Sequence, residues 1–384
     1  MMIKKLISTA MAIMAVLILT AQKRLSIIPE FPQRGQTVTV NFDPRIAGAG
    51  SSGKSIGPDA GIVTLVFSSS TLYDQPYRVD MEKKGGIWTI SFPLERYATF
   101  ASFYLQSGEI IDTPAKGHYE IMVYDKKRKP VFSANLHRGY SLNQQLGKSP
   151  GLAAAQAAMF KKELELYPDN YEAKLRLLTS QMNAAPENGK EKFKKEALKV
   201  IADRFYAAPT NGGNLNKVTM GYHIIGEPQR VDSIRKVVIE KYAGSDLAWE
   251  YYIGQIAREK DTATKITLLE KALQHETAAN GNAFTGAHER LFELYAAKKD
   301  SAKALYHAGF MRRGEKDPYT PRMYKEITQT LLENDLALDS AAWYAEHTLS
   351  MADSFPVGVI RYWPETGYVY PYTNDSMRQS VYST

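Results

Sequence analysis

The segment best suited to chemistry is residues 48–55, which read Gly-Ala-Gly-Ser-Ser-Gly-Lys-Ser and fit the pattern G-x-x-x-x-G-K-[ST]. In a phosphate-binding loop the backbone N–H groups hold the phosphates, the lysine reaches the outer ones, and the hydroxyl binds magnesium. This chemistry needs a helix directly after the loop, because the helix N-terminus faces the phosphate. Here Gly57-Pro58 follows, and residues 62–68 then have the pattern of a strand. We therefore interpret the segment as a glycine- and serine-rich hairpin loop.

Other reactive side chains do not form a recognisable constellation. Ser51-x-x-Lys54 echoes the serine–lysine pair of penicillin-binding enzymes but lacks their partner motifs. None of the seven histidines belongs to an H-E-x-x-H motif, and cysteine is absent, which excludes thiolate chemistry and disulfides in this chain. Glu163 and Glu165 are two apart on a predicted helix and point to different faces. The sequence predicts no catalytic residue, no cofactor and no metal ligand, and hence a protein that is not an enzyme.

Aromatic side chains are densest near the C-terminus, where they alternate with prolines. Such groups can form a face that binds a peptide or a sugar, or they can cap the open end of a helical array by packing. The predicted partner-binding residues are Tyr362, Trp363, Tyr368, Tyr370 and Tyr372.

A switch in hydrophobic period near residue 140 defines the elements that position these residues. Before it, apolar residues alternate as in strands, with turn signals such as Gly85-Gly86 between the runs. This pattern predicts an immunoglobulin-like β-sandwich over residues 25–140. The predicted strands are Thr37–Phe42, Ile62–Ser68, Tyr77–Met81, Ile87–Phe92, Thr99–Leu105, Tyr119–Tyr124 and Pro130–Ala134.

Residues 141–152 are polar and contain Gly147, Pro150 and Gly151, so they are predicted to be a linker. From residue 153 to 384 the apolar residues fall three and four apart, as in helices that come in pairs. Proline between units and a spacing of about 38 residues between Ala304 and Ala342 predict an all-α, tetratricopeptide-like array, with Asn211–Asn214 as an interruption. A plain helical bundle is the alternative. The fold class is thus α+β with several domains.

The N-terminal 21 residues have the features of a secretory signal peptide: Lys4 and Lys5, an apolar stretch from Leu6 to Leu19, and a small residue, Ala21, before the cleavage site. The alternative is an uncleaved anchor, but the stretch is short for a spanning helix. We expect a periplasmic or otherwise extracytoplasmic protein with no stable membrane span after cleavage. The formal net charge of +7 is scattered among acidic residues, which predicts no nucleic-acid partner.

Several strings support a resemblance to a known family. They include Pro29–Gly35, Arg96–Phe100, Tyr167–Leu175, residues 288–295 (His-Glu-Arg-Leu-Phe-Glu-Leu-Tyr) and Asp353–Pro356. Together they resemble the non-catalytic N-terminal region of secreted bacterial thioredoxin-like oxidoreductases of the TlpA type. The resemblance implies a C-terminal thioredoxin domain with a Cys-x-x-Cys motif, and this cysteine-free chain does not contain one. A truncated or divergent member is expected.

Two functions follow from these observations. The leading prediction is a non-catalytic periplasmic scaffold, in which the groove of the helical repeats binds a peptide or protein. The alternative is the substrate-presenting part of a thiol–disulfide oxidoreductase, with a thioredoxin-like protein as partner. A glycan-binding module that uses Trp363 is a weaker third prediction.

Overall fold

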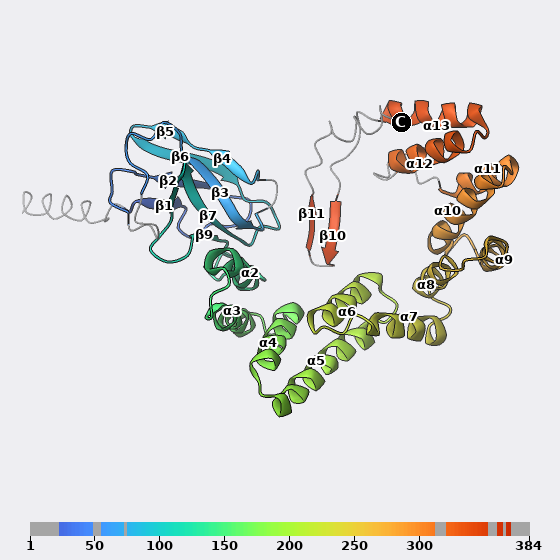
Figure 1. The fold of residues 1–384 in the computed structure, drawn as a ribbon, viewed down its shortest axis with the longest axis horizontal. Helices are drawn as coiled ribbons and strands as arrows, with labels where there is room; N and C mark the ends of the chain where they lie inside the picture. Colours follow the sequence, from blue (N-terminus) through green and yellow to red (C-terminus); the bar gives the residue numbers. More distant parts are fainter. Residues whose placement is uncertain are drawn as a thin grey trace, which may run out of the picture. The chain divides into compact units, whose positions relative to one another are not determined.

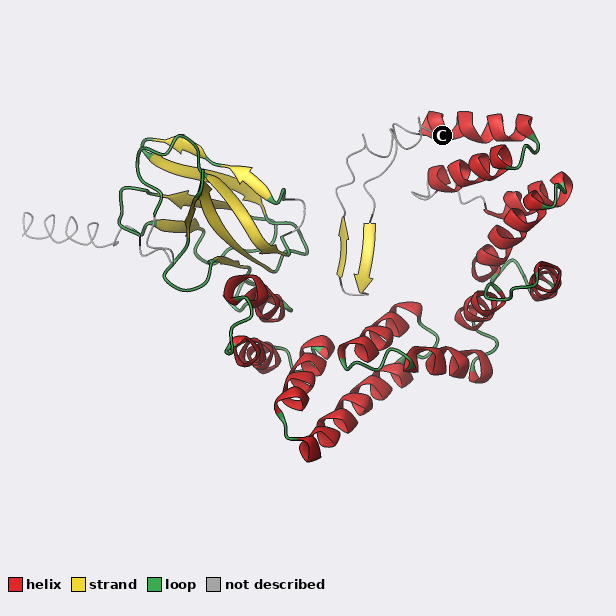
Figure 2. Ribbon diagram, viewed as in Figure 1, coloured by secondary structure: helices red, strands yellow, loops and turns green. Residues whose placement is uncertain are grey.

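The computed structural model describes residues 23–48, 55–72, 75–311, 320–351, 359–363 and 366–369, the last two ranges by their backbone alone. The chain divides into two compact units, Met1–Lys174 and Leu175–Thr384. Figure 1 labels their elements along the chain, and Figure 2 separates strands from helices. The predicted signal peptide lies outside the described residues. None of the helices in the described part combines the length and apolar character that a membrane crossing needs.

Unit 1 contains two antiparallel sheets (Figure 2). The first has the strand order β1-β2-β6-β5, and the second has the order β4-β3-β7-β8, with β9 also paired to β7. The strands are β1 (Leu25–Ile28), β2 (Thr37–Phe42), β3 (Thr64–Ser70), β4 (Arg78–Asp80), β5 (Glu82–Lys84), β6 (Ile87–Pro93), β7 (Phe100–Ser107), β8 (Ile110–Asp112) and β9 (Tyr119–Met122).

The alternation that predicted the strands also builds the core of unit 1. Val38, Val40 and Phe42 of β2 are fully buried, because successive side chains of a strand point to opposite faces. Phe67 of β3 meets Phe92 of β6 edge to face, with ring centroids 6.0 Å apart, so both sheets contribute to one hydrophobic cluster. The prediction of a β region before residue 140 is confirmed, whereas an immunoglobulin-like sandwich remains a proposal.

Two helices complete unit 1, α2 (Ala134–Leu146) and α3 (Leu152–Leu166), and α4 (Tyr171–Ala184) crosses the boundary between the units. Residues 141–146 of the predicted linker therefore belong to a helix. Gln145 bonds to the β region, where its carboxamide oxygen accepts the His118 N–H at 3.0 Å. Ser141 is fully buried and donates to the Arg138 carbonyl oxygen within α2. Polarity here marks an interface between helix and sheet, not a free connection.

The predicted strand Pro130–Ala134 is wrong for a related reason. Pro130 makes only an isolated bridge to Tyr124, and Ser133 has a left-handed backbone with φ of 67° directly before α2. The Glu163 carboxylate, fully buried on α3, accepts the N–H groups of Ser133 at 2.7 Å and Asn135 at 3.1 Å. A side chain about 30 residues away thus satisfies the free N–H groups at the start of α2.

Unit 2 is a tandem array of helices that pack mainly on their sequence neighbours, as α10 does on α11 and α12 on α13. One hydrophobic cluster runs from α8 to α13, with Phe284, Leu291 and Ile327 fully buried. The helices are α5 (Glu187–Ala207), α6 (Gly212–Ile224), α7 (Arg230–Lys241), α8 (Asp246–Ile256), α9 (Thr262–Leu273), α10 (Gly281–Ala297), α11 (Ser301–Met311), α12 (Thr320–Glu333) and α13 (Leu338–Met351), followed by β10 (Val359–Trp363) and β11 (Thr366–Val369).

The helical array is confirmed, but its predicted interruption at Asn211–Asn214 is wrong. These residues begin α6, because the Asn211 side chain accepts the Asn214 N–H at 2.8 Å as an N-cap. Asn214 in turn donates to the carbonyl oxygens of Arg204 and Ala208 near the end of α5. The glycines between them are therefore part of a capped helix start.

Candidate functional site

A pocket of about 210 Å³ opens in unit 2 between α7, α8 and α9, and we call it the Trp249 pocket. Its walls are mainly apolar, except for a lysine and a histidine side chain at the end of α9. The lining residues are Ile239, Ala243, Ala248, Trp249, Tyr252, Lys271, Ala272 and His275.

The start of α8 sets the aromatic wall of this pocket. Ser245 is the N-cap, and its hydroxyl accepts the Ala248 N–H at 3.2 Å. Residues 248, 249 and 252 then project from one side of the helix, since positions three and four apart share a face. Trp249 is held by stacking on His275 (centroids 4.8 Å apart) and by packing on Phe284 of α10 (5.2 Å). The wall is therefore formed before a ligand arrives.

The charge at the pocket is positive. None of the described lining residues is acidic, and within the described part of the chain the exposed Lys271 ammonium has no ion-pair partner. An apolar pocket with one uncompensated cation at its edge suits an apolar group that carries a negative charge nearby.

A buried polar chain lies next to the pocket, and we call Glu276, His288 and His307 the histidine chain. The His288 Nε2 atom is 2.9 Å from the Glu276 carboxylate, and its Nδ1 atom is 2.9 Å from Nδ1 of His307. Only 2% of His288 and 5% of His307 is exposed. The two Nδ1 atoms are at hydrogen-bond distance, 2.9 Å apart. One of them must therefore carry a hydrogen and donate it, and the other must accept it.

A second group of polar side chains surrounds His307. Tyr295, whose ring stacks on His307 at 5.8 Å, donates its hydroxyl proton to Glu270, and Lys303 lies 3.0 Å from the same hydroxyl. Burial, together with His288, lowers the pKa of His307 to about 4. The Tyr295 hydrogen bond and the Lys303 charge lower the pKa of Glu270, whereas burial raises the pKa of Tyr295. His307 is consequently neutral at pH 7.

The predicted aromatic site is only partly within the described residues. Tyr362 and Trp363 lie on β10 and Tyr368 on β11, and the backbones of these strands form an antiparallel hairpin in which Ile360 pairs with Tyr368. Tyr370 and Tyr372 lie outside the described residues. Partner binding by these five residues stays a prediction.

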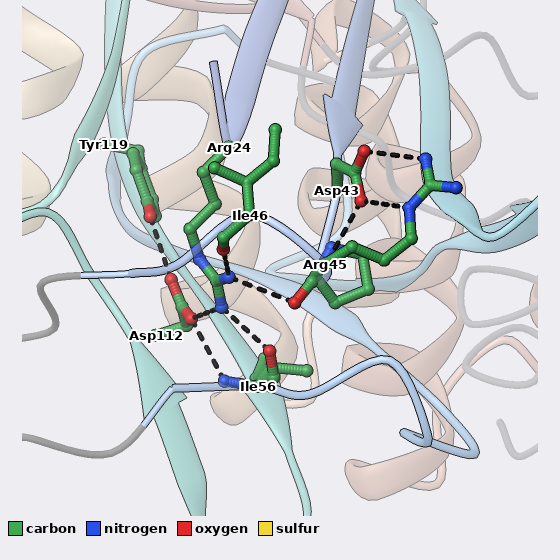
Figure 3. A network of polar contacts seen from close by, with 8 residues as sticks. Arg24, Asp43, Arg45, Ile46, Ile56, Asp112 and Tyr119 are labelled. Carbon is green, nitrogen blue, oxygen red and sulfur yellow. Dashed lines mark hydrogen bonds and ion pairs between the residues drawn. The ribbon is translucent and has the colours of Figure 1, made fainter. Parts of the chain in front are cut away.

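The phosphate-loop motif overlaps the described residues only at its ends, since residues 49–54 lie outside them. The next element is β3 from Thr64, a strand, as the sequence predicted. Both ends of the loop are fixed by Arg24 (Figure 3), which donates to the carbonyl oxygens of Ile46 and Ile56 and pairs with the buried Asp112 at 2.5 Å. Asp112 also accepts the Ile56 N–H and the Tyr119 hydroxyl. We assign this network a structural role.

The Trp249 pocket and the histidine chain were not predicted. The histidines are 19 residues apart and meet only because α10 and α11 form a hairpin. No group of three His, Cys, Asp or Glu side chains suited to a metal ion occurs among the described residues. A usable sequence signal for the pocket was the run Trp249-Glu-Tyr-Tyr252, which begins four residues after the serine N-cap Ser245.

Comparisons with known proteins give matches only among solved structures. No family model matches the chain, and no curated protein matches it. One similar structure is a human IFIT1 dimer with m7Gppp-AAAA, at 16% identity over 60% of this chain and 54% of that chain, with a TM-score of 0.29. Another is a human IFIT1 dimer with PPP-AAAA, at 17% identity over 58% and 52% of the two chains, with a TM-score of 0.28. The chain spans about half the length of these proteins.

These matches correct one prediction. The sequence led us to exclude nucleic acid as a partner, because its positive charges are scattered. The matched structures are named as complexes with capped or triphosphorylated oligonucleotides, and we therefore withdraw this exclusion. Because the TM-scores of these matches are only 0.28 to 0.29, we assign no function to this chain from the similarity.

Proposed function

We propose that this chain is a non-catalytic binding scaffold whose Trp249 pocket holds an apolar side chain of a peptide or protein partner. The observation that carries the proposal is the preformed aromatic wall of the pocket, with Trp249 fixed by His275 and Phe284. Tandem helical hairpins present such surfaces between neighbouring repeats. We include in this proposal that the helical hairpins are tetratricopeptide-like repeats.

The size and charge of the pocket narrow its occupant. A cavity of about 150 Å³ accommodates benzene, so the 210 Å³ here has room for a phenyl ring or a branched aliphatic side chain. Lys271 at the edge favours a carboxylate next to that side chain. The proposed ligand is therefore a peptide segment with one aromatic or branched residue beside an acidic one.

A selection from a random peptide library tests the proposal. We expect enriched peptides to share an aromatic or branched anchor next to Asp or Glu. Ala243→Trp fills the pocket from an exposed turn and should abolish binding, whereas Ala302→Trp, at an exposed alanine on α11 outside the pocket, should leave it unchanged. Peptides that bind both variants equally would refute the proposal.

We also propose that unit 1 is an immunoglobulin-like sandwich. What supports this is the strand order, since β1-β2-β6-β5 and β4-β3-β7-β8 follow the orders A-B-E-D and C′-C-F-G of that fold. The resemblance to TlpA-type N-terminal regions stays a proposal that rests on the sequence alone. The same holds for the alternative function that follows from it, the substrate-presenting part of a thiol–disulfide oxidoreductase. An affinity measurement between this chain and a thioredoxin-like Cys-x-x-Cys protein tests that alternative, and no binding would count against it.

An extracytoplasmic location is proposed from the signal-like sequence of residues 1–21. Fusion of this segment to alkaline phosphatase, which is active only outside the cytoplasm, provides the test. A fusion without phosphatase activity would refute the proposed location.

A further inference from the structure

The histidine chain contains a pair of buried rings that cannot both be fully protonated in their present places. The Nδ1 atoms of His288 and His307 face each other at 2.9 Å, which leaves room for one proton between them. A second proton would place two N–H donors against each other in a buried environment. The contact between α10 and α11 therefore depends on how many protons the pair holds.

Charged groups of both signs face the pair. The Glu276 carboxylate, on the turn before α10, is 2.9 Å from the Nε2 atom of His288. Glu270 of α9 favours a positive charge on the His307 ring, whereas Lys303 of α11 opposes one. On the remaining sides the pair meets rings, because Phe310 stacks on His288 at 4.2 Å and Tyr306 and Tyr295 contact His307.

The same chain is connected to the Trp249 pocket at two places, through the turn at residues 275–276 and through α10. Glu276, which bonds to His288, directly follows His275, the residue that stacks on Trp249. On α10, Phe284 packs on Trp249 four residues before His288. A change in the position of α10 or of the turn at 275–276 would therefore change the aromatic wall.

We propose that the histidine chain makes the Trp249 pocket sensitive to protons: a second proton on the pair separates α10 from α11, releases Glu276 and weakens ligand binding. This inference rests on the proposed binding function of the pocket and names its regulation.

Proton linkage gives the direction of the pH effect on opening and the pH range in which it occurs. In the closed pair the pKa of His307 is about 4, and in an opened, solvated state it returns to its ordinary value of 6.5. The opened state therefore binds more protons between these values, and acid favours it. From pH 7 to pH 5 the ratio of opened to closed molecules rises about 20-fold.

Hydrogen exchange of the α10 and α11 amides in the full chain, corrected for intrinsic rates, measures this opening without any ligand. We expect a rise of about 20-fold from pH 7 to pH 5. His307→Asn keeps a side-chain N–H near the position of Nδ1 but cannot bind a proton, so its exchange should lose this pH dependence. His223→Asn, at an exposed histidine on α6, is the matched control and should behave as the wild type.

The effect on the pocket is measured in parallel with 8-anilino-1-naphthalenesulfonate, an apolar anion that suits the lining and Lys271. Its affinity should fall at pH 5 in the wild type and in His223→Asn, but not in His307→Asn. Ala243→Trp should block the dye at both pH values, which identifies the site.

The outcomes separate the two proposals. If neither the dye nor any selected peptide binds at pH 7, the proposed binding function is refuted. Hydrogen exchange of the α10 and α11 amides still tests the switch in that case. Equal pH dependence of exchange in His307→Asn and wild type overturns the switch. If His307→Asn does not fold, ¹⁵N shifts of the wild-type histidine rings decide: two imidazolium rings at pH 5 with unchanged exchange would also overturn it.

Discussion

Glu163→Gln is the most informative single substitution in unit 1. The Glu163 carboxylate is fully buried and accepts three hydrogen bonds: the backbone N–H of Ser133 (2.7 Å), the backbone N–H of Asn135 (3.1 Å) and the Asn170 side-chain amide (3.0 Å). Glutamine has almost the same shape but replaces one acceptor oxygen by an NH₂ group, which then faces a donor. It also removes a negative charge from the start of α2.

The expected cost follows from these two losses. A hydrogen bond to a charged group contributes about 1.5–3 kcal/mol, and a charge at a helix N-terminus about 0.3–1 kcal/mol. We therefore expect unit 1 to lose about 2–4 kcal/mol of its free energy of unfolding. At about 2–4 °C for each kcal/mol in a domain of this size, its melting temperature should fall by roughly 5–15 °C.

The assay is urea unfolding of the full chain, followed by the ¹⁹F resonance of 5-fluorotryptophan at the buried Trp88 of β6, which reports on unit 1. Glu165→Gln is the control, because it makes the same chemical change on the same helix at an exposed position. If both variants unfold at the same urea concentration, the proposed capping of α2 by Glu163 is wrong.

Three further predictions concern stability. Burial lowers the pKa of His137 to about 4, so the unfolded state of unit 1 binds more protons than the folded state below pH 6.5. In urea unfolding, the free energy of unfolding should therefore fall with decreasing pH, by an amount that approaches about 3 kcal/mol at pH 4. His137→Gln should flatten this pH dependence. Asp112→Asn leaves Arg24 without its buried partner and should cost about 3–5 kcal/mol, whereas Glu82→Gln breaks an exposed pair and should change the free energy of unfolding by less than about 1 kcal/mol; equal losses would contradict a structural role for the Arg24 network. Asn211→Ala removes the N-cap of α6 and should lower the free energy of unfolding by about 1 kcal/mol in thermal unfolding, and no loss would show that this cap does not stabilise the helix.

Strand positions were predictable where one face of the strand is buried. The predicted strand Thr37–Phe42 coincides with β2, because Val38, Val40 and Phe42 alternate with more exposed residues. In contrast, β5 consists of three exposed residues, Glu82–Lys84, and carries no apolar signal at all. Its pairing to β6 is made by the backbone, which the sequence pattern does not record.

The candidate site was not predictable from spacing. Ile239, Trp249 and His275 lie on different elements, and they meet because of the angles at which α7, α8 and α9 pack. Those angles depend on side-chain packing across the whole hairpin array. The sequence singled out the region 362–372 for its density of rings, whereas the pocket uses only two aromatic side chains and one histidine.

The remote cap on α2 also affects the order of events during synthesis. The strands of unit 1 have all been made once Met122 is complete, yet the N–H groups at the start of α2 lack their acceptor until Glu163 has been added. Since chains grow from the N-terminus and domains fold as units, a ribosome that has passed the last strand still carries an unfinished domain. About 40 residues are therefore added after the last strand before the N–H groups at the start of α2 have their acceptor.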